Sequence, residues 1–454
     1  MASALSSLAI AAMSFVALLV FLSAFIKVIR RGEWTGTATL AAVVVIPTIS
    51  FLQIVVTYLG DWQPVTDAFF DLQWLNPEWA RVAWEALNVL LGIFCLTVFV
   101  VRVRRPDTML NIPAVLYLVV ALMSFASALL NGDNPFRPVS LVFMAMLLLS
   151  TVAPRGLGIH IGVGTCCVII AIASGLTMIS HRDFSVLPCV GGGEKCGILG
   201  FRFQGVMLNE NALALALALA MPFVYLAFDS WEGFALSGFL LAIILVTGSR
   251  SGTMAGLVTF VVLIVVRPNI RRPRPAPIRR ALLYLGLAGA AVVGLTLPFV
   301  IHNPASFHGR AYLWSLARGA ISEPGPLMYG AGVEGWQHFR DAGLIGFTSV
   351  YSVHNQWLQV LFSTGLIGFA VFVSMLVVLL WQARQTYALV VGCVLVPVFM
   401  LAATERPWTL DTTDWMAWAV VAALLSYPLT RVPATPEPPA RGLDRAEAPK
   451  VLEH

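Results

Sequence analysis

The sequence predicts an all-α integral membrane protein that crosses the bilayer about 12 to 13 times. The chain of 454 residues is 59% hydrophobic and only 11% charged, and its mean hydropathy is +0.85. Soluble domains carry about 25% charged residues, so this composition excludes an ordinary soluble domain. The apolar runs are long enough to span a bilayer as helices, and they lack the alternation of polar and apolar residues that β-barrel strands show.

Thirteen apolar runs are the predicted membrane helices, and several of them are short. In chain order they cover residues 5–29, 36–59, 82–101, 110–130, 138–153, 157–179, 212–228, 234–248, 252–266, 281–301, 357–381, 387–403 and 416–429. The first run is interpreted as a helix because no basic segment precedes it, as one would in a cleavable signal peptide. Residues 1–432 are therefore expected to form one polytopic transmembrane domain.

The tail, residues 433–454, is rich in proline and charge, which predicts a disordered segment. Its last residues, Leu-Glu-His, resemble the remnant of an expression tag.

The basic residues predict the orientation of these helices, because Lys and Arg accumulate on the cytoplasmic side. With thirteen helices, 18 of the 28 basic residues fall on one side, which is then cytoplasmic and holds the C-terminus. The net charge of +5 follows from this topology and does not indicate a nucleic-acid partner. The other ten oppose the insertion bias, so we look for function among them: Arg81, Arg137, Arg182, Lys195, Arg202, Arg250, Arg310, Arg318, Arg340 and Arg406.

Two outer loops are long enough to contribute to a site. The longer one, residues 302–356, predicts an amphipathic helix over 305–322, then turns rich in Pro and Gly, then a second short helix from Trp336. The other, residues 180–211, contains Cys189 and Cys196. Their spacing allows a small disulfide loop in an oxidising compartment.

Two arginines in these outer segments are candidate anion ligands. Arg250, in T-G-S-R-S-G, lies between two apolar helices, where an arginine at bilayer depth costs about 2.5–3.5 kcal/mol. It either reaches the interface from its helix end or faces a polar cavity and binds an anion. Arg202, in F-R-F-Q-G-V-M-L-N-E-N-A, is either a solvated or ion-paired loop residue or a phosphate ligand. Asn209 and Asn211 beside it can cap the following helix or hold sugar hydroxyls.

His354 and Asn355 stand at the start of a long apolar run. A histidine in this place is either a hydrogen-bonded packing residue or a base that accepts a proton near neutral pH. Asn355 is interpreted mainly as a residue that starts the helix. The acids Asp411 and Asp414 could lie near the same site, although Asp414 could equally cap a helix. No Walker loop, DxD, HExxH or serine elbow is present in the sequence, so no metal site is predicted.

Five motifs in order resemble the O-antigen ligase family and its polymerase relatives. They are R-F-Q-G-V-M-L-N-E-N-A-L-A, T-G-S-R-S-G, G-R-A-Y-L-W, P-L-M-Y-G-A-G-V and H-N-Q-W-L-Q-V-L-F-S-T-G-L-I-G, over roughly residues 200–380. The resemblance implies a GT-C-like membrane glycosyltransferase that needs no cofactor. It would move a glycan from undecaprenyl diphosphate to a glycan or glycolipid acceptor, such as lipid A-core, at the outer face of the bacterial plasma membrane. The thirteen helices differ from the twelve usual in the ligases and indicate a divergent branch.

The resemblance also implies roles for single residues. Arg202 and Arg250 match the arginines that hold the donor diphosphate, and His354 matches the histidine proposed to activate the acceptor hydroxyl. Arg310 and Trp314 match the G-R…W element of the long outer loop, to which we assign a positional role within the substrate site. A diphosphate leaving group needs fixed positive charge and a hydroxyl needs a base, so this chemistry suits the residues. Displacement by the hydroxyl would invert the anomeric centre.

Three other functions remain open on the sequence. A polysaccharide polymerase that joins lipid-linked repeat units, or a protein O-oligosaccharyltransferase, would use the same arginines and histidine. A flippase or transporter for a lipid-linked glycan belongs to a different class, and it should carry charged residues along a path through both leaflets. Here the charged residues gather at the outer face, which favours an enzyme.

Overall fold

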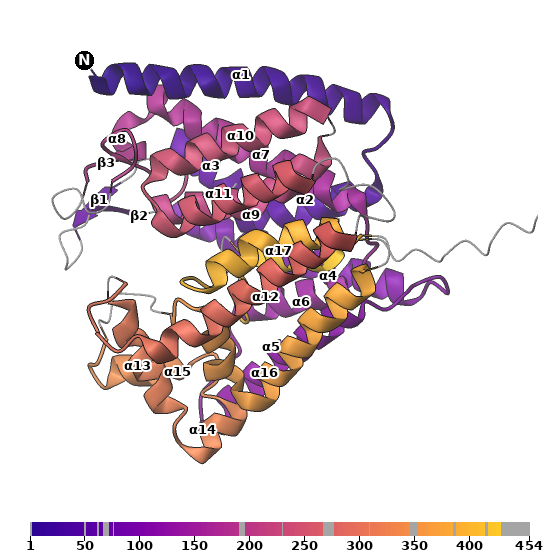
Figure 1. The fold of residues 1–454 in the computed structure, drawn as a ribbon, viewed down its shortest axis with the longest axis vertical. Helices are drawn as coiled ribbons and strands as arrows, with labels where there is room; N and C mark the ends of the chain where they lie inside the picture. Colours follow the sequence, from indigo (N-terminus) through magenta and orange to yellow (C-terminus); the bar gives the residue numbers. More distant parts are fainter. Residues whose placement is uncertain are drawn as a thin grey trace, which may run out of the picture.

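The computed structural model describes residues 2–49, 51–60, 63–66, 72–75, 77–189, 196–228, 230–266, 277–307, 309–345, 352–384, 387–413 and 416–427. Fourteen helices make up the bundle in these ranges (Figure 1). They are α1 (Ala2–Arg30), α2 (Gly36–Ile49), α3 (Phe51–Leu59), α4 (Glu78–Val103), α5 (Ile112–Leu130), α6 (Pro138–Val152), α7 (Leu157–Ser180), α9 (Glu210–Ala227), α10 (Ser230–Thr247), α11 (Arg250–Val266), α12 (Pro277–Val300), α16 (Gln356–Ala383), α17 (Ala388–Ala402) and α18 (Ala417–Leu425).

The all-α membrane architecture predicted from the apolar runs is confirmed. Each of the thirteen runs contains a helix, and the run over residues 36–59 contains two, α2 and α3. Within the described ranges, 7 helices are long and apolar enough to cross a membrane, and five shorter apolar helices accompany them. The predicted disordered tail, residues 433–454, lies outside the described residues.

Helix α9 lies at the centre of the bundle, and nearly all of its residues are buried. Its alternating Ala and Leu residues let the neighbouring helices approach closely, as small residues do in membrane proteins. A Cβ added at Gly164 of α7 would lie 2.9 Å from the Cβ of Ala227, and one at Gly252 of α11 would lie 2.4 Å from that of Ala214. These approaches fix α7 and α11 against α9.

The segments between the bundle helices include short helices and hairpins. Helices α13 (Arg310–Ala320), α14 (Pro324–Tyr329) and α15 (Gly335–Asp341) form most of the long loop, and α8 (Arg182–Ser185) lies in the other. Strands β1 (Gln63–Thr66) and β2 (Leu72–Leu75) form one antiparallel hairpin; β3 (Val186–Leu187) and β4 (Arg202–Phe203) form the second. They gather at one end of the bundle: in Figure 1, α8, β1, β2 and β3 lie at the left, and α13, α14 and α15 lie at the lower left.

The long loop contains one more helix than the sequence indicates. The expected amphipathic helix is α13 and the expected second helix is α15, but α14 forms where only turns were predicted. Pro324 stands at the first position of α14, where a proline costs no helical hydrogen bond. The turns follow the helix instead, at Gly330 and Gly332, both with positive φ.

Helix α16 is broken at Gly365, and the long loop docks into the break. Gly365 has φ 62° and ψ −169°, so the carbonyls just before it are free for other donors. The amide of Ala331 donates to the oxygen of Phe362 at 2.6 Å, and that of Gly332 donates to the oxygen of Ser363 at 3.1 Å. The P-L-M-Y-G-A-G-V segment therefore anchors the helices of the long loop to the membrane bundle.

Candidate functional site

His354 lies two residues before the start of α16, in a conformation that few non-glycine residues adopt. Its φ is +48°, in the left-handed region, and its backbone amide faces the hydroxyl of Ser352 at 3.4 Å. Residues held in this region often mark functional sites, because the surrounding structure must maintain them. About a third of the His354 side chain, 32%, is exposed.

Asn355 fixes the position of the backbone next to His354. Its side-chain oxygen accepts from the amide of Leu358 at 2.9 Å and so caps α16, as the sequence predicts. Its amide nitrogen donates to the carbonyl oxygens of Gly294 at 2.8 Å and Ala403 at 2.9 Å. Asn355 is fully buried, and its side chain ties together α12, α16 and the end of α17.

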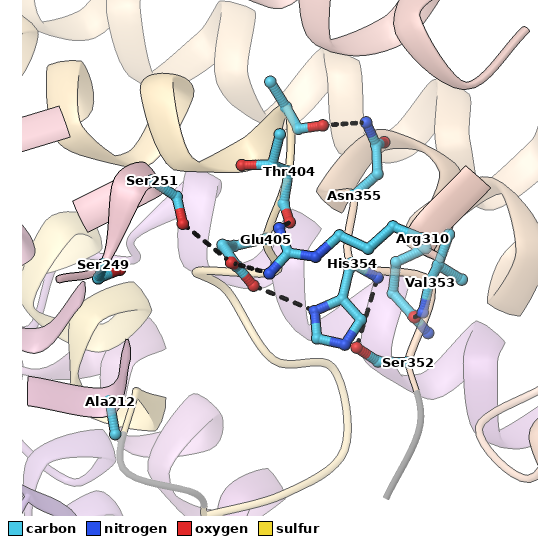
Figure 2. Close-up of polar contacts among 12 residues, drawn as sticks. Ala212, Ser249, Ser251, Arg310, Ser352, Val353, His354, Asn355, Thr404 and Glu405 are labelled. Carbon is cyan, nitrogen blue, oxygen red and sulfur yellow. Dashed lines mark hydrogen bonds and ion pairs between the residues drawn. The ribbon is translucent and has the colours of Figure 1, made fainter. Parts of the chain in front are cut away.

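Glu405 gathers three polar side chains from distant parts of the chain, as Figure 2 shows. Nδ1 of His354 lies 3.1 Å from its Oε2, while Nη2 of Arg310 lies 2.5 Å from its Oε1. The hydroxyl of Ser251 donates to Oε1 at 3.1 Å. Only 7% of the Glu405 side chain is exposed. We call Ser251, Arg310, His354 and Glu405 the Glu405 cluster.

The Glu405 carboxyl is held in its ionised form. Burial raises its pKa, but the hydrogen bond from His354 and the positive charge of Arg310, together with that of His354 when its ring is protonated, outweigh burial and lower the pKa below its ordinary value. An ionised carboxylate accepts hydrogen bonds and cannot donate them, so a neutral His354 must donate its Nδ1–H to Glu405. The lone pair of the imidazole is then on Nε2, which has no hydrogen-bond partner among the described residues.

The G-R…W motif of α13 holds the Glu405 cluster together. Gly309, with φ 81°, turns the chain into α13 at Arg310. Arg310 donates to the carbonyl oxygen of Thr404 as well as to Glu405. Trp314 is fully buried, and its indole N–H donates to the carbonyl oxygen of Val353 at 2.8 Å. Trp314 therefore supports the backbone just before His354.

Arg250 begins α11 and belongs to the turn that reaches the cluster. Its side chain is exposed, and the residue after it, Ser251, binds Glu405. Gly248, with φ +81°, shapes the turn, and the Ser249 hydroxyl accepts from the amide of Gly252 at 3.3 Å. The helix N-terminus adds its partial positive charge to that of the guanidinium, which suits an anionic ligand.

Arg202 is buried in β4, beside the start of α9. Its Nη1 lies 3.5 Å from Oε1 of Glu210, and the two side chains are only 4% and 3% exposed. Its Nε donates to the carbonyl oxygen of Pro188 at 2.8 Å. Asn209 caps α9 through the amide of Ala212 at 2.7 Å, and Asn211 is half-buried on the first turn.

Glu405 is a site residue that the sequence does not single out in T-E-R-P-W-T-L-D-T-T-D-W. The sequence indicates Asp411 and Asp414 instead, of which Asp414 lies outside the described residues. The hydroxyl of Thr409 donates a hydrogen bond to the carboxyl group of Asp411 at 3.4 Å, and the positive charge of Arg137 also acts on this carboxyl group. The signal that could have found Glu405 is its place directly after an apolar helix, on the same predicted outer side as His354. No group of three His, Cys, Asp or Glu side chains that could hold a metal ion occurs among the described residues.

Comparison with known proteins supports a family assignment for part of the chain. No curated protein and no solved structure matches the chain. Residues 235–373 match the family model described as O-antigen ligase, and this stretch contains Arg250, Arg310 and His354. This stretch, less than half of the chain, is therefore similar to the O-antigen ligase family.

Proposed function

We propose that the protein transfers a glycan from undecaprenyl diphosphate to an acceptor hydroxyl at the outer face of the bacterial plasma membrane. The observation that carries this proposal is the contact between His354 and the ionised Glu405. It leaves Nε2 of His354 as the acceptor nitrogen of a side chain that is about a third exposed, which is the arrangement that a general base needs. The family match over residues 235–373 supports lipid-linked glycans as the substrate class.

The reaction is a single displacement. Nε2 of His354 takes the proton of the acceptor hydroxyl while its oxygen forms a bond to the anomeric carbon of the donor. The bond from that carbon to the diphosphate oxygen breaks, and undecaprenyl diphosphate leaves with the electron pair. The anomeric centre is inverted because the oxygen attacks from the opposite side. Glu405 is a positioning residue that orients the imidazole and stabilises its protonated form.

Positive charge must stabilise the negative charge that develops on the diphosphate as it leaves. Arg250, exposed at the N-terminus of α11, is the residue to which we assign this role, with Arg202 supporting the same site from β4. Arg310 already binds Glu405, so its role is to hold the base in place. We assign Asn211 to the side of the site that faces the sugar. We assign Asn355 the role of holding the backbone of the site in place.

Transfer by purified protein in detergent tests the proposal. The donor is an undecaprenyl-diphosphate-linked glycan, and the variants are His354→Ala and Arg250→Ala. We expect each to lower the transfer rate by at least about 10²-fold, the usual contribution of a base or of a charged group at the leaving oxygen. His302→Ala is the matched control, because His302 is exposed in the same outer loop and should leave the rate unchanged.

Two results would contradict the proposal. Transfer at the wild-type rate by both folded variants would remove His354 and Arg250 from the site. Movement of intact donor across vesicles without release of undecaprenyl diphosphate would make the protein a transporter.

A further inference from the structure

One disulfide bond joins the segment before α9. Cys189 and Cys196 are bonded, and their Cα atoms are 5.0 Å apart. Both are half-buried, whereas Cys95, Cys166 and Cys167 are free and lie within α4 and α7. Cys393, in α17, is also free. The disulfide is thus the one covalent cross-link among the described residues.

The chain on the Cys189 side of this disulfide holds Arg202. Pro188, the residue before Cys189, accepts a hydrogen bond from Nε of Arg202 at 2.8 Å. Leu187 pairs with Arg202 in the ladder between β3 and β4. That ladder has only two residues in each strand, and a hairpin of this size is marginal on its own. A covalent cross-link beside this hairpin therefore restricts the movement of its two strands relative to each other.

The chain on the Cys196 side lies against the turn that leads to Arg250. A Cβ at Gly248 would be 2.9 Å from the carbonyl carbon of Cys196, and one at Gly197 would be 2.1 Å from the oxygen of Val246. The amide of Ile198 faces the oxygen of Leu245 at 3.4 Å. Backbone is thus packed directly on backbone two residues before Arg250.

We propose that the Cys189–Cys196 disulfide is a positioning element that holds the turn before Arg250 in place for the donor diphosphate. One end of the cross-link adjoins the carbonyl that binds Arg202, which is buried and paired with Glu210, and the other adjoins the turn before Arg250. A cation that is fixed in advance binds a diphosphate better than one that must be ordered on binding. The inference rests on the proposed function, because it assumes that Arg250 meets the diphosphate.

The test measures binding of undecaprenyl diphosphate to purified protein in detergent. It compares the wild type, the double variant Cys189→Ser/Cys196→Ser, and the wild type treated with dithiothreitol. Dithiothreitol is oxidised to its cyclic disulfide as the two cysteines become thiols. We expect both changes to weaken binding about tenfold. They should also raise the KM for the donor while kcat at saturating donor stays nearly constant.

The double variant is also the control for the reductant, since dithiothreitol should leave its affinity unchanged. Thermal unfolding establishes that each protein is folded, and the reduced wild type gives the answer if the double variant does not fold. Unchanged affinity after reduction, or a loss of kcat at constant KM, would overturn this inference and leave the proposed function standing. A wild type that neither binds undecaprenyl diphosphate nor transfers glycan would overturn both.

Discussion

Among single residues, Glu405 connects the most distant parts of the site, and its ionisation should be visible in the stability of the protein. Its pKa is lowered in the fold, so its ionised form is stabilising. This contribution is complete above the ordinary value of 4.5 and is lost as the pH falls through the lower, folded value. Glu405→Gln should therefore cost about 1–3 kcal/mol at pH 7, because Arg310 loses its anionic partner.

Thermal unfolding between pH 3 and 7, followed by tryptophan fluorescence, measures this effect. The difference in unfolding temperature between Glu405→Gln and the wild type should become smaller as the pH falls. A gap that is constant with pH would contradict the ionised Glu405. The variant should also transfer glycan roughly 10- to 100-fold more slowly, as expected when the orienting partner of a histidine is removed.

The pKa of Asp411 is shifted in the opposite direction to that of Glu405, so its effect on stability should depend on pH in the opposite way. Burial raises its pKa, and the charges of Arg406 and Arg137 offset this only in part. A raised pKa means that the ionised carboxyl destabilises the fold, so stability is lost as the pH rises through the folded value. Asp411→Asn should unfold at the same or a higher temperature than wild type at pH 7, and its advantage should vanish at acid pH. A clear loss of stability at pH 7 would refute this interpretation.

The sequence predicts His354 and Asn355 but not the partner of His354, for a physical reason. A helix cap depends on neighbours three residues away, so Asn355 can be recognised locally. The contact between His354 and Glu405 joins residues 51 positions apart, and it depends on how α16 and α17 pack. Several acids share the outer side, and charge alone does not choose between Glu405 and Asp411.

At the scale of elements, the break in α16 is the feature that the sequence hides most completely. Apolar runs predict the helices because a bilayer requires length and hydrophobicity, and glycine is common in membrane helices. Gly365 therefore looks like part of an unbroken helix. Its conformation is set by Met328 of α14, whose carbonyl carbon would lie 2.3 Å from a Cβ at Gly365. This contact is tertiary, so local sequence does not encode it.

Gly365→Ala should disrupt the docking of the outer helices. An alanine at φ 62° and ψ −169° is strained by about 1–3 kcal/mol, and its Cβ also overlaps the backbone of α14. We expect lower thermal stability and loss of transfer, since α13 to α15 carry Arg310. Gly289→Ala in α12 is the matched control: its Cβ meets nothing within 4 Å, so stability should stay constant or rise slightly. Equal stability of both variants would argue against the break as an anchor.

At the scale of the whole molecule, the hairpins and short helices gather at one end of the bundle (Figure 1). The Glu405 cluster includes Arg310, the first residue of α13, which is one of these short helices. The positive-inside rule predicts that this end of the bundle is the outer end. Alkaline phosphatase fused after Asp133, between α5 and α6, should be active outside the cytoplasm. The same enzyme fused after Arg104, which follows α4, should be inactive. The reverse pattern would invert the orientation and place His354 in the cytoplasm.

The stereochemistry of one turnover tests the central claim most directly. Purified wild-type protein is given an undecaprenyl-diphosphate glycan of known anomeric configuration, and the product linkage is determined by NMR. A base at His354 predicts an inverted linkage and one undecaprenyl diphosphate released for each glycan transferred, with both signals absent in His354→Ala. A retained configuration, or equal turnover by the folded His354→Ala variant, would contradict direct displacement assisted by His354.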